Sequence, residues 1–295
     1  MCRGLSQIFK PDEYLVPRDL EEALNYRKRY GEESTIVAGG TLVYELGKRG
    51  LILPQKLIDI SRLGLEYVRR EPNGFAVGAM TKLRQFLDYE ELMEPIEYGA
   101  LSECVKEFRP HQVRNVATVG GQLCSGYSAF DLPPVLLALD AKVKMRSLKG
   151  ERTLALDKFF LGYFETALAP GEILTELHIP NAPKGTCSAF EKFERTSVDL
   201  ATVNVAVRLT VEKGKCADAR ICLGAISNTP FRAIQSEETL RGKRLDEETI
   251  NHASQTVSTE VKPTDSLTGS GEYKKHLSSV ITKRALTRAA GKIEN

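Results

Sequence analysis

Along the first 180 residues, apolar positions switch repeatedly between helical and strand-like spacing. Leu20 and Leu24 recur at helical spacing between Asp19, a typical N-cap residue, and Gly31, a typical helix stop. Short β-branched runs separated by such segments predict small α/β units, the second of which begins near Arg62. The expected strands are 35–38, 56–60, 75–79, 143–145 and 174–179, and the expected helical stretches are 20–30, 42–50 and 81–108.

Beyond residue 185 the pattern changes to long β-rich runs followed by helical ones. The segment 180–185 contains two prolines and a glycine, which is typical of a linker. Strands first and helices afterwards predict an α+β domain rather than a continuation of the alternating one. The sequence therefore predicts one domain over 1–180, with subdomains of about 1–61 and 62–180, and a second over 185–292. Its expected strands are 186–193, 201–211 and 219–226, and its expected helices are 247–257 and 272–290.

Composition excludes several classes of protein. The chain has 295 residues, of which 42% are hydrophobic and 27% charged, so it can bury a core and is neither fibrous nor disordered. A net charge of +2 gives no general reason to bind nucleic acid or an anionic membrane. The longest apolar run, 132–139, is far shorter than the ~20 residues of a membrane span. Residues 1–6 lack the apolar core of a signal peptide, which predicts a cytoplasmic protein.

The six cysteines do not form a metal-ligand pattern. No C-x-x-C pair occurs, so neither a zinc site nor a local iron–sulfur site is expected, and no metal ligands are predicted. Scattered cysteines are typical of free thiols in a reducing compartment. Cys124 stays of interest because it lies just beyond the second of two Gly-Gly pairs. The cysteines are Cys2, Cys104, Cys124, Cys187, Cys216 and Cys222.

The candidate chemistry lies in the two Gly-Gly pairs, Gly39-Gly40 and Gly120-Gly121, each preceded by a β-branched run and accompanied by a threonine. Glycine lets backbone N–H groups converge on an anion and lets a ligand lie against the main chain. Two such loops could hold both ends of one pyrophosphate. A Gly-Gly after a strand is also a common turn, but the matched hydroxyls of Thr41 and Thr118 favour a ligand. Neither loop fits the G-x-G-x-x-G or P-loop pattern.

The residues around these pairs carry a family resemblance. Val37 to Thr41 looks like the first flavin loop of the FAD-binding subunits of molybdenum hydroxylases, the group that includes xanthine dehydrogenase and aerobic carbon monoxide dehydrogenase. The second loop resembles that family's signature almost position by position. The matching residues are Gln112-Val113-Arg114-Asn115, Ala117 to Gly121, Leu123-Cys124, Asp131 to Pro134 and Leu136 to Leu139, with further matches at 172–176, 190–192, 195, 199–201 and 272–277.

The resemblance implies an α+β fold. Its first part is a two-subdomain α/β FAD-binding domain of the vanillyl-alcohol-oxidase (PCMH) type, and a C-terminal domain with a small antiparallel sheet and helices follows. It also implies FAD as the cofactor, held by one loop at the pyrophosphate and by the other at the second side of the flavin nucleotide. The implied FAD-binding residues are Ile36, Val37, Ala38, Gly39, Gly40, Thr41, Leu42, Ala117, Thr118, Gly120, Gly121, Cys124, Ser125, Asp131, Leu174 and Lys192.

Roles and departures can be assigned residue by residue. Asp131 would accept hydrogen bonds from a ribose or ribityl hydroxyl, although a turn or cap residue before a proline is the alternative. Lys192 would lie near the isoalloxazine, although a solvated lysine on an edge strand is the alternative. The family's usual Asn after the second Gly-Gly is Gln122 here, and its common Asp after the first Thr is Leu42. Tyr127 or Phe130 could cover a flavin edge, or could simply pack.

The resemblance implies an oxidoreductase subunit that passes electrons from an iron–sulfur subunit to an external acceptor such as NAD, with no catalytic residue of its own. The implied partners are a molybdenum-cofactor large subunit and a small subunit with two two-iron two-sulfur clusters, in a dimer of heterotrimers. Neither nucleic acid nor a membrane span is expected. Three alternatives stay open: a stand-alone FAD-dependent oxidase of the vanillyl-alcohol-oxidase type, a flavin-free structural subunit, and a nucleotide enzyme whose Gly loops bind substrate.

Overall fold

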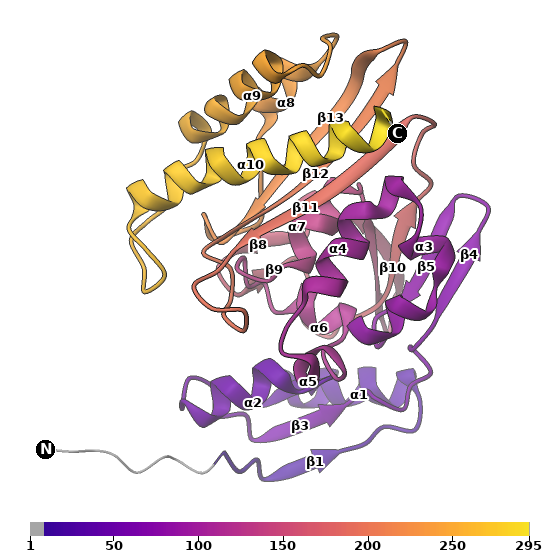
Figure 1. Ribbon diagram of the computed structural model, residues 1–295. Coiled ribbons are helices and arrows are strands. Elements are labelled where there is room, and N and C mark those ends of the chain that lie inside the picture. The colour runs from indigo at the N-terminus through magenta and orange to yellow at the C-terminus, as the bar shows by residue number, and fades with distance from the viewer. Residues whose placement is uncertain (1–8, 295) are drawn as a thin grey trace, which may run out of the picture.

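The computed structural model describes residues 9–294, in which three larger β-sheets follow one another along the chain (Figure 1). The N-terminal residues 1–6 considered above, Cys2 included, lie outside the described residues. The mixed α/β architecture, with an antiparallel sheet and helices in the C-terminal part, is the predicted fold class.

The first sheet is parallel, in the order β1-β3-β2. The Asp19 carboxylate accepts a hydrogen bond from the amide of Glu22 at 2.8 Å and caps α1, which Gly31 ends with a φ of +49°. Because β2 and β3 are parallel, their carboxyl ends meet at one edge of the sheet. The elements are β1 (Glu13–Leu15), α1 (Leu20–Tyr30), η1 (Gly31–Glu33), β2 (Ser34–Val37), α2 (Thr41–Lys48) and β3 (Lys56–Asp59).

The second sheet is antiparallel, in the order β4-β5-β10-β6-β7, and its core is closed by α4, α6 and α7. The apolar run 132–139 forms α7, whose prolines stand in the first turn, where a helix needs no amide donor. The elements are β4 (Val68–Glu71), β5 (Gly74–Gly78), α5 (His111–Arg114), α6 (Val119–Cys124), α7 (Leu132–Ala138), β6 (Lys142–Ser147), β7 (Gly150–Ala155), η4 (Leu156–Lys158), β8 (Phe160–Gly162), β9 (Glu165–Thr166) and β10 (Ile173–Pro180).

The long helical stretch expected over 81–108 is wrong. The chain there forms two short 3-10 helices and two α-helices instead. Pro95 stands directly before the second 3-10 helix in an extended conformation, and proline cannot continue a helix because it lacks an amide donor. Helical spacing of apolar residues was thus present without one continuous helix. The elements are η2 (Leu83–Asp88), α3 (Glu90–Met93), η3 (Ile96–Tyr98) and α4 (Gly99–Glu107).

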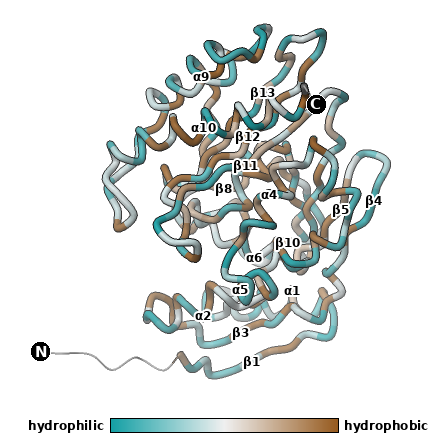
Figure 2. The backbone as a smooth tube through the Cα atoms, viewed as in Figure 1, coloured by the Kyte–Doolittle hydropathy of each residue, from teal (hydrophilic) through white to brown (hydrophobic). Residues whose placement is uncertain are grey.

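The third sheet is antiparallel, in the order β11-β12-β13-β14. Along β12, Val203 and Val205 face a core made with the C-terminal helices, whereas Ala206 faces the core of the preceding sheet. Hydrophobic stretches accordingly run through the middle of the molecule, and hydrophilic residues lie on the outer helix α9 (Figure 2). The elements are β11 (Thr186–Phe193), β12 (Val203–Glu212), β13 (Lys215–Gly224), β14 (Phe231–Arg232), α8 (Ile234–Leu240), α9 (Glu247–Glu260) and α10 (Gly271–Glu294).

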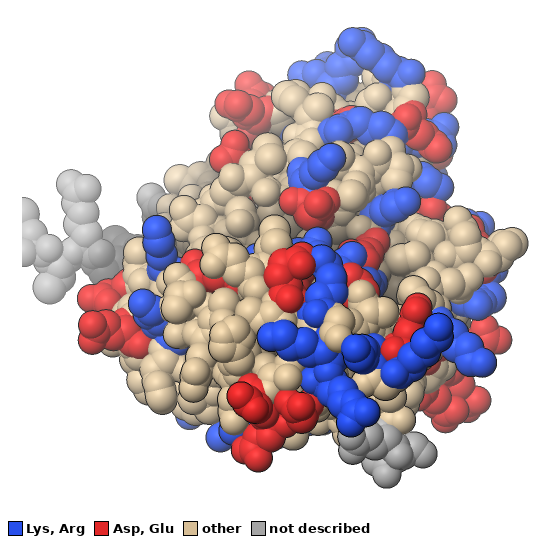
Figure 3. All heavy atoms as spheres, turned by 90° about the horizontal axis from the view of Figure 1, so that it is seen from above, with Lys and Arg blue, Asp and Glu red and all other residues tan. Residues whose placement is uncertain are grey.

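Seen from above, Lys and Arg side chains gather in a band across this face, among scattered acidic ones (Figure 3). Of the two outer helices, α10 contains several Lys and Arg residues, whereas α9 contains none. None of the helices within residues 9–294 combines the length and apolar character that crossing a membrane requires.

The edge strand β11 is covered by α4, so the second and third sheets are joined closely. Glu103 of α4 accepts hydrogen bonds from the amide of Phe190 at 2.7 Å and from the ammonium of Lys292 at 2.9 Å. Ser188 of β11 accepts a hydrogen bond from the amide of Ala100 at 2.9 Å. A free sheet edge is thereby satisfied by side chains rather than by another strand.

Candidate functional site

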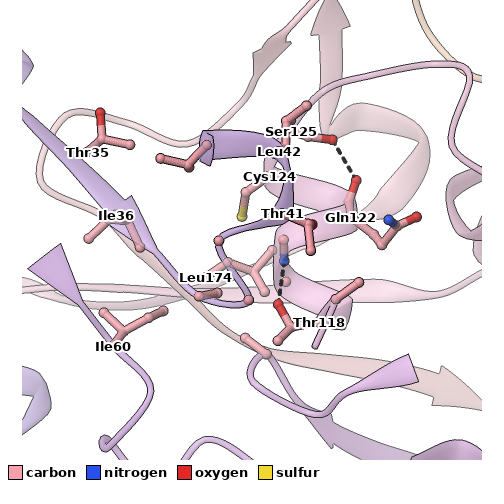
Figure 4. A pocket seen from close by; sticks show the side chains of 18 of the residues that line it. Thr35, Ile36, Thr41, Leu42, Ile60, Thr118, Gln122, Cys124, Ser125 and Leu174 are labelled. Atoms are coloured by element: carbon pink, nitrogen blue, oxygen red, sulfur yellow. Dashed lines mark hydrogen bonds between the residues drawn. The ribbon is translucent and has the colours of Figure 1, made fainter. Parts of the chain in front are cut away.

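A cavity of about 240 Å³ lies between the carboxyl edge of the first sheet and helix α6, whose first turn contains the second Gly-Gly pair (Figure 4). Both Gly-Gly pairs line it, and in Figure 4 Thr41 of α2, Thr118 beside α6 and Leu174 of β10 surround the same space. The lining residues are Thr35, Ile36, Ala38 to Val43, Ile60, Ala79, Ala117, Thr118, Gly120 to Gln122, Cys124, Ser125, Phe130, Leu168 and Glu172 to Leu174.

The first Gly-Gly pair connects β2 to α2 and leaves its amides free. Gly40 adopts a φ of +71°, which turns the chain into the start of α2 without a side-chain cap. Among the described residues, none accepts a hydrogen bond from the amides of residues 39–43. A helix N-terminus with free N–H groups carries a partial positive charge, so this loop can hold an anion in the cavity.

Gly39 has a different task, because it brings the two loops together. A Cβ at Gly39 would lie 1.9 Å from the carbonyl oxygen of Val116, the residue two positions before Thr118. The chain before the second Gly-Gly pair therefore passes directly over the first pair. This contact brings the two pairs, 81 positions apart in the sequence, to the same cavity.

The second Gly-Gly pair lies inside the first turn of α6, and its amides are already used. Thr118 caps the helix by accepting a hydrogen bond from the amide of Gly121 at 3.1 Å (Figure 4). The amide of Gly120 donates to the carbonyl of Ala79 at 2.8 Å, and that of Val119 donates to the carbonyl of Thr81 at 2.9 Å. The expectation that this pair offers free donors to an anion is therefore wrong. It offers a close, side-chain-free surface instead.

The two glycines of this second pair also differ. A Cβ at Gly120 would lie 2.8 Å from the carbonyl oxygen of Ala79, so the packing of α6 on β5 requires a glycine there. A Cβ at Gly121 would meet only the hydroxyl oxygen of Thr118, at 3.0 Å, and Gly121 is exposed. The absence of a side chain at Gly121 therefore leaves space for a ligand in the cavity and is not required by the packing of the fold.

The rest of α6 supplies one inert and one unsatisfied side chain. Burial raises the pKa of the Cys124 thiol to about 12, so this cysteine is no nucleophile at neutral pH. The carbonyl oxygen of the Gln122 side chain is buried and has no hydrogen-bond partner in the described part of the chain. A buried acceptor without a donor fits a ligand that carries hydroxyl or N–H groups. Ser125 donates its hydroxyl hydrogen to the backbone carbonyl of Gln122 at 2.9 Å, and not to the side-chain carbonyl (Figure 4).

The only carboxylate among the described lining residues, Glu172, is already neutralised. Arg152 donates to its two oxygens, each at 2.7 Å, and the amide of Ala169 donates to one of them. The guanidinium holds the pKa of Glu172 below its ordinary value. The cavity wall therefore opposes a bound anion less than an unpaired carboxylate would.

Asp131 and Lys192 do not line the cavity but contact each other next to it. The Lys192 ammonium lies 3.0 Å from one oxygen of Asp131 and 2.6 Å from Glu194, and the Lys192 side chain is only 8% exposed. The alternative of a solvated lysine is therefore wrong. Asp131 stands at the N-cap position of α7, yet its side chain makes no cap hydrogen bond, so the cap alternative is also wrong. Phe130, one residue earlier, does line the cavity.

Asp131 and Lys192 each favour the charged form of the other. Burial opposes ionisation of Lys192, but the carboxylates of Asp131 and Glu194 outweigh it and raise the pKa of the ammonium above its ordinary value. Burial raises the pKa of Asp131, and the charge of Lys192 opposes that rise. The arrangement places a fixed positive charge, with its counter-ions, beside the cavity.

Thirteen of the sixteen predicted FAD-binding residues line the cavity. Val37 is buried beneath the loop, while Asp131 and Lys192 stand behind Phe130. Sequence reasoning missed Ile60, although the parallel neighbour of a loop-bearing strand ends at the same edge. It also missed Glu172, because an ion pair to a distant strand leaves no local signal. The other lining residues not predicted are Thr35, Val43, Ala79, Gln122, Phe130, Leu168 and Ile173.

The aromatic residues after α6 pack against the β8–β9 hairpin. The rings of Tyr127 and Phe164 are stacked at 5.0 Å, and Phe130 meets Tyr127 edge-on at 5.2 Å. Gly126 permits this approach, since a Cβ there would lie 2.7 Å from the amide of Glu165. Of the aromatic residues weighed in the sequence, Phe130 reaches the cavity and Tyr127 packs behind it.

Comparison with known families gives two matches in succession. The family described as the FAD binding domain in molybdopterin dehydrogenase matches residues 7–182, and the CO dehydrogenase flavoprotein C-terminal domain matches residues 188–289. The first covers the cavity and both Gly-Gly pairs, and the second covers the third sheet with its helices.

Individual relatives extend over nearly the whole chain. The 6-hydroxypseudooxynicotine dehydrogenase complex subunit alpha of Paenarthrobacter nicotinovorans is 31% identical over 94% of each chain. The carbon monoxide dehydrogenase medium chain of Afipia carboxidovorans is 30% identical over 96% of this chain and 98% of its own. A solved structure of carbon monoxide dehydrogenase from Hydrogenophaga pseudoflava superimposes with a TM-score of 0.92 at 30% identity, over 97% of this chain and 99% of that one.

Proposed function

Because the chain belongs to the family of FAD-binding subunits of molybdenum hydroxylases, which are oxidoreductases, we propose that it carries electrons from an iron–sulfur subunit to an external acceptor such as NAD. The observation that carries this proposal is the cavity in which both Gly-Gly pairs meet. When bound there, FAD supplies the electron-accepting and electron-donating chemistry.

Different residues of the cavity would bind different parts of the cofactor. The free amides of residues 39–43 and the Thr41 hydroxyl would hold the pyrophosphate, because anions are stabilised at a helix N-terminus. Gly121 would let the cofactor lie against α6, and Gln122 would receive a hydrogen bond from it. Leu174, buried on β10, would exclude water from the ring system.

Asp131 and Lys192 would act at the side of the cavity closed by Phe130. A carboxylate accepts hydrogen bonds from hydroxyl groups, and each oxygen of Asp131 retains acceptor capacity beyond its present partner. The buried ammonium of Lys192 would favour negative charge developing on a nearby ring. No residue of the chain is assigned a catalytic role.

The partners form part of the same proposal. Relatives named as medium chains and as subunits of dehydrogenase complexes belong to multi-chain assemblies. The large subunit would carry the molybdenum cofactor and select the substrate, and a small subunit with two two-iron two-sulfur clusters would deliver electrons, in a dimer of heterotrimers. We assign the FAD-binding domain to 1–180 and the C-terminal domain to 185–292, and we place the protein in the cytoplasm, where free thiols such as the five described here persist.

Replacing Gly121 by Val tests the cofactor site. The Val side chain would grow into the cavity from a position where a Cβ meets little of the protein, so FAD retention should be lost while circular dichroism stays unchanged. Gly291→Val is the matched control, because a Cβ there meets no atom within 4 Å and the position lies far along α10. Bound flavin is measured by absorbance after gel filtration.

Three outcomes would contradict parts of the proposal. A wild-type chain that binds no FAD even when FAD is added would leave a flavin-free structural subunit. A Gly121→Val variant that retains stoichiometric FAD would show the loop assignment to be wrong. FAD that stays attached after denaturation would favour a stand-alone oxidase. The acceptor is tested separately, by adding NAD anaerobically to the reduced complex and following its absorbance.

A further inference from the structure

Asn204 reaches from the C-terminal sheet toward the cofactor cavity. It lies on β12, is fully buried, and donates a hydrogen bond from its side-chain amide to one oxygen of Asp131 at 2.7 Å. The same amide lies 3.3 Å from the carbonyl oxygen of Phe130. Because an ionised carboxylate only accepts hydrogen bonds, the amide nitrogen must face Asp131.

The third sheet is built to admit this side chain. Asn204 is paired across the sheet with Lys192 on one side and with Gly224 on the other. A Cβ at Gly224 would lie 2.2 Å from the side-chain oxygen of Asn204, so the glycine leaves room for the carboxamide. The side-chain oxygen of Asn204 is buried and has no hydrogen-bond partner among the residues described. The side chain therefore makes its hydrogen bonds through the amide nitrogen.

The two donors divide the carboxylate between them. Asn204 donates to one oxygen of Asp131 and Lys192 donates to the other, at 3.0 Å, and both donors come from the C-terminal sheet. A carboxylate held at both oxygens cannot rotate without breaking one bond. Its orientation, and that of the Phe130 carbonyl at the cavity wall, is thereby set by residues of another domain.

We infer that Asn204 is a positioning residue for the cofactor: its carboxamide fixes the Asp131 carboxylate and the Phe130 carbonyl, and through Asp131 it fixes the Lys192 ammonium. This role rests on the proposed function, because it assumes that FAD occupies the cavity. The C-terminal domain then contributes to FAD binding through a residue that need not touch FAD. Without Asn204, Asp131 would keep only Lys192 as a partner.

Asn204→Asp tests the amide directly, because it replaces the donor with an acceptor of the same shape. Two ionised carboxylates that face each other repel at high pH. As the pH falls, the pair takes up one proton, and that proton restores a hydrogen bond between them. We expect FAD to bind about tenfold more weakly at about pH 8.5 and to regain most of that loss at about pH 6. The dissociation constant is measured by flavin fluorescence on the full chain.

Several other groups near this site could also titrate. Lys192 of β11, Glu194 just after that strand and Asp131 just before α7 face the site, and the charge of Asp131 acts on Cys104 and Glu107 of α4. All of them are present in wild type and in the control Asn73→Asp, which makes the same change in an exposed turn. These two proteins report the pH dependence of FAD binding that does not involve Asn204, and the inference concerns the difference from them.

Asn204→Leu removes the amide without adding a charge and should weaken FAD binding about tenfold at both pH values. This variant decides the matter if Asn204→Asp fails to fold at the higher pH. Equal FAD affinity of wild type and Asn204→Leu, or an Asn204→Asp affinity loss that does not recover in acid, would overturn the inference. A wild type without FAD affinity would instead overturn the proposed function, so the two failures are distinguishable.

Discussion

Gly39-Gly40 and Gly120-Gly121 each accompany a threonine at the start of a helix, but their backbones are used in different ways. At the first pair, the amides of residues 39–43 have no partner among the described residues. At the second, the amides of Gly120 and Gly121 already donate to Ala79 and Thr118. One loop can therefore bind an anion by its backbone, whereas the other can only bring a ligand close to a helix.

A second difference runs within each pair. Gly39 and Gly120 have no room for a Cβ because protein backbone lies in the way, whereas a Cβ at Gly40 or Gly121 would meet only one side chain, at 3.6 Å and 3.0 Å respectively. One glycine of each pair is therefore required by packing and the other by the ligand or the turn. In each Gly-Gly pair, one position thus requires glycine for close packing, and the adjacent position requires it for the ligand or the turn.

The largest effect is expected at Gly39. In Gly39→Ala the new methyl group would lie 1.9 Å from the carbonyl oxygen of Val116, so the two loops must separate. We expect a loss of roughly 3 kcal/mol of stability together with loss of FAD. Gly40→Ala is the matched control: its positive φ costs about 1 kcal/mol, but its Cβ meets only Val37 at 3.6 Å. Equal destabilisation of both variants in urea unfolding would contradict the proposed division of tasks.

Substitutions of Thr118 and Thr41 should also affect stability and FAD binding differently, but with smaller changes in stability than at Gly39. Thr118→Val removes the cap of α6 and leaves the amide of Gly121 without its acceptor, which should cost about 1 kcal/mol of stability. Thr41→Val removes a hydroxyl that has no partner among residues 9–294, so stability should stay unchanged while FAD affinity falls. Thermal unfolding and flavin fluorescence measure the two effects. The comparison fails if Thr41→Val destabilises the protein as much as Thr118→Val does.

The sequence predicted the loops well because their chemistry is local. Thr118 caps α6 at Gly121, and Gly40 turns the chain directly into α2, so a short motif records them. The contact of Gly39 with Val116 is not local, and the motif does not record it. The surroundings of Asp131 could not be read in this way. Its partners Lys192 and Asn204 come from strands 61 and 73 positions away, and only the register of β11 with β12 places them side by side.

The same contrast explains the mistaken helix over 81–108. Apolar spacing reports which side of a segment is buried, but not whether one helix continues along it. Pro95 and the 3-10 helices on either side of it break the segment, although Phe86, Leu92 and Leu101 along it are all buried. The direction of the chain between the two loops therefore depended on backbone details that the apolar pattern does not carry.

A smaller, pH-dependent effect is expected from Glu172 in the cavity wall. Arg152 lowers the pKa of Glu172 below the unfolded value of about 4.3, so the pair stabilises the fold above that pH and loses this contribution as the pH falls through the lower, folded pKa. Since Arg152 is 43% exposed and water screens it, the contribution is about 0.5 kcal/mol. Glu172→Gln should lower stability at neutral pH and not in acid. A difference that persists at about pH 2 would contradict this assignment.

The smallest effect is expected at Cys124, where the absence of reaction is informative. Its thiol lines the cavity beside the second Gly-Gly pair, and burial raises its pKa to about 12, so at neutral pH it holds about a thousandfold less thiolate than an ordinary thiol. Iodoacetamide should leave Cys124 of the folded chain unmodified, with or without FAD, as measured by peptide mass spectrometry. The denatured chain, in which every cysteine reacts, is the control. Rapid alkylation of the folded protein would mean that the Cys124 thiol ionises readily in the cavity wall, which would contradict its raised pKa.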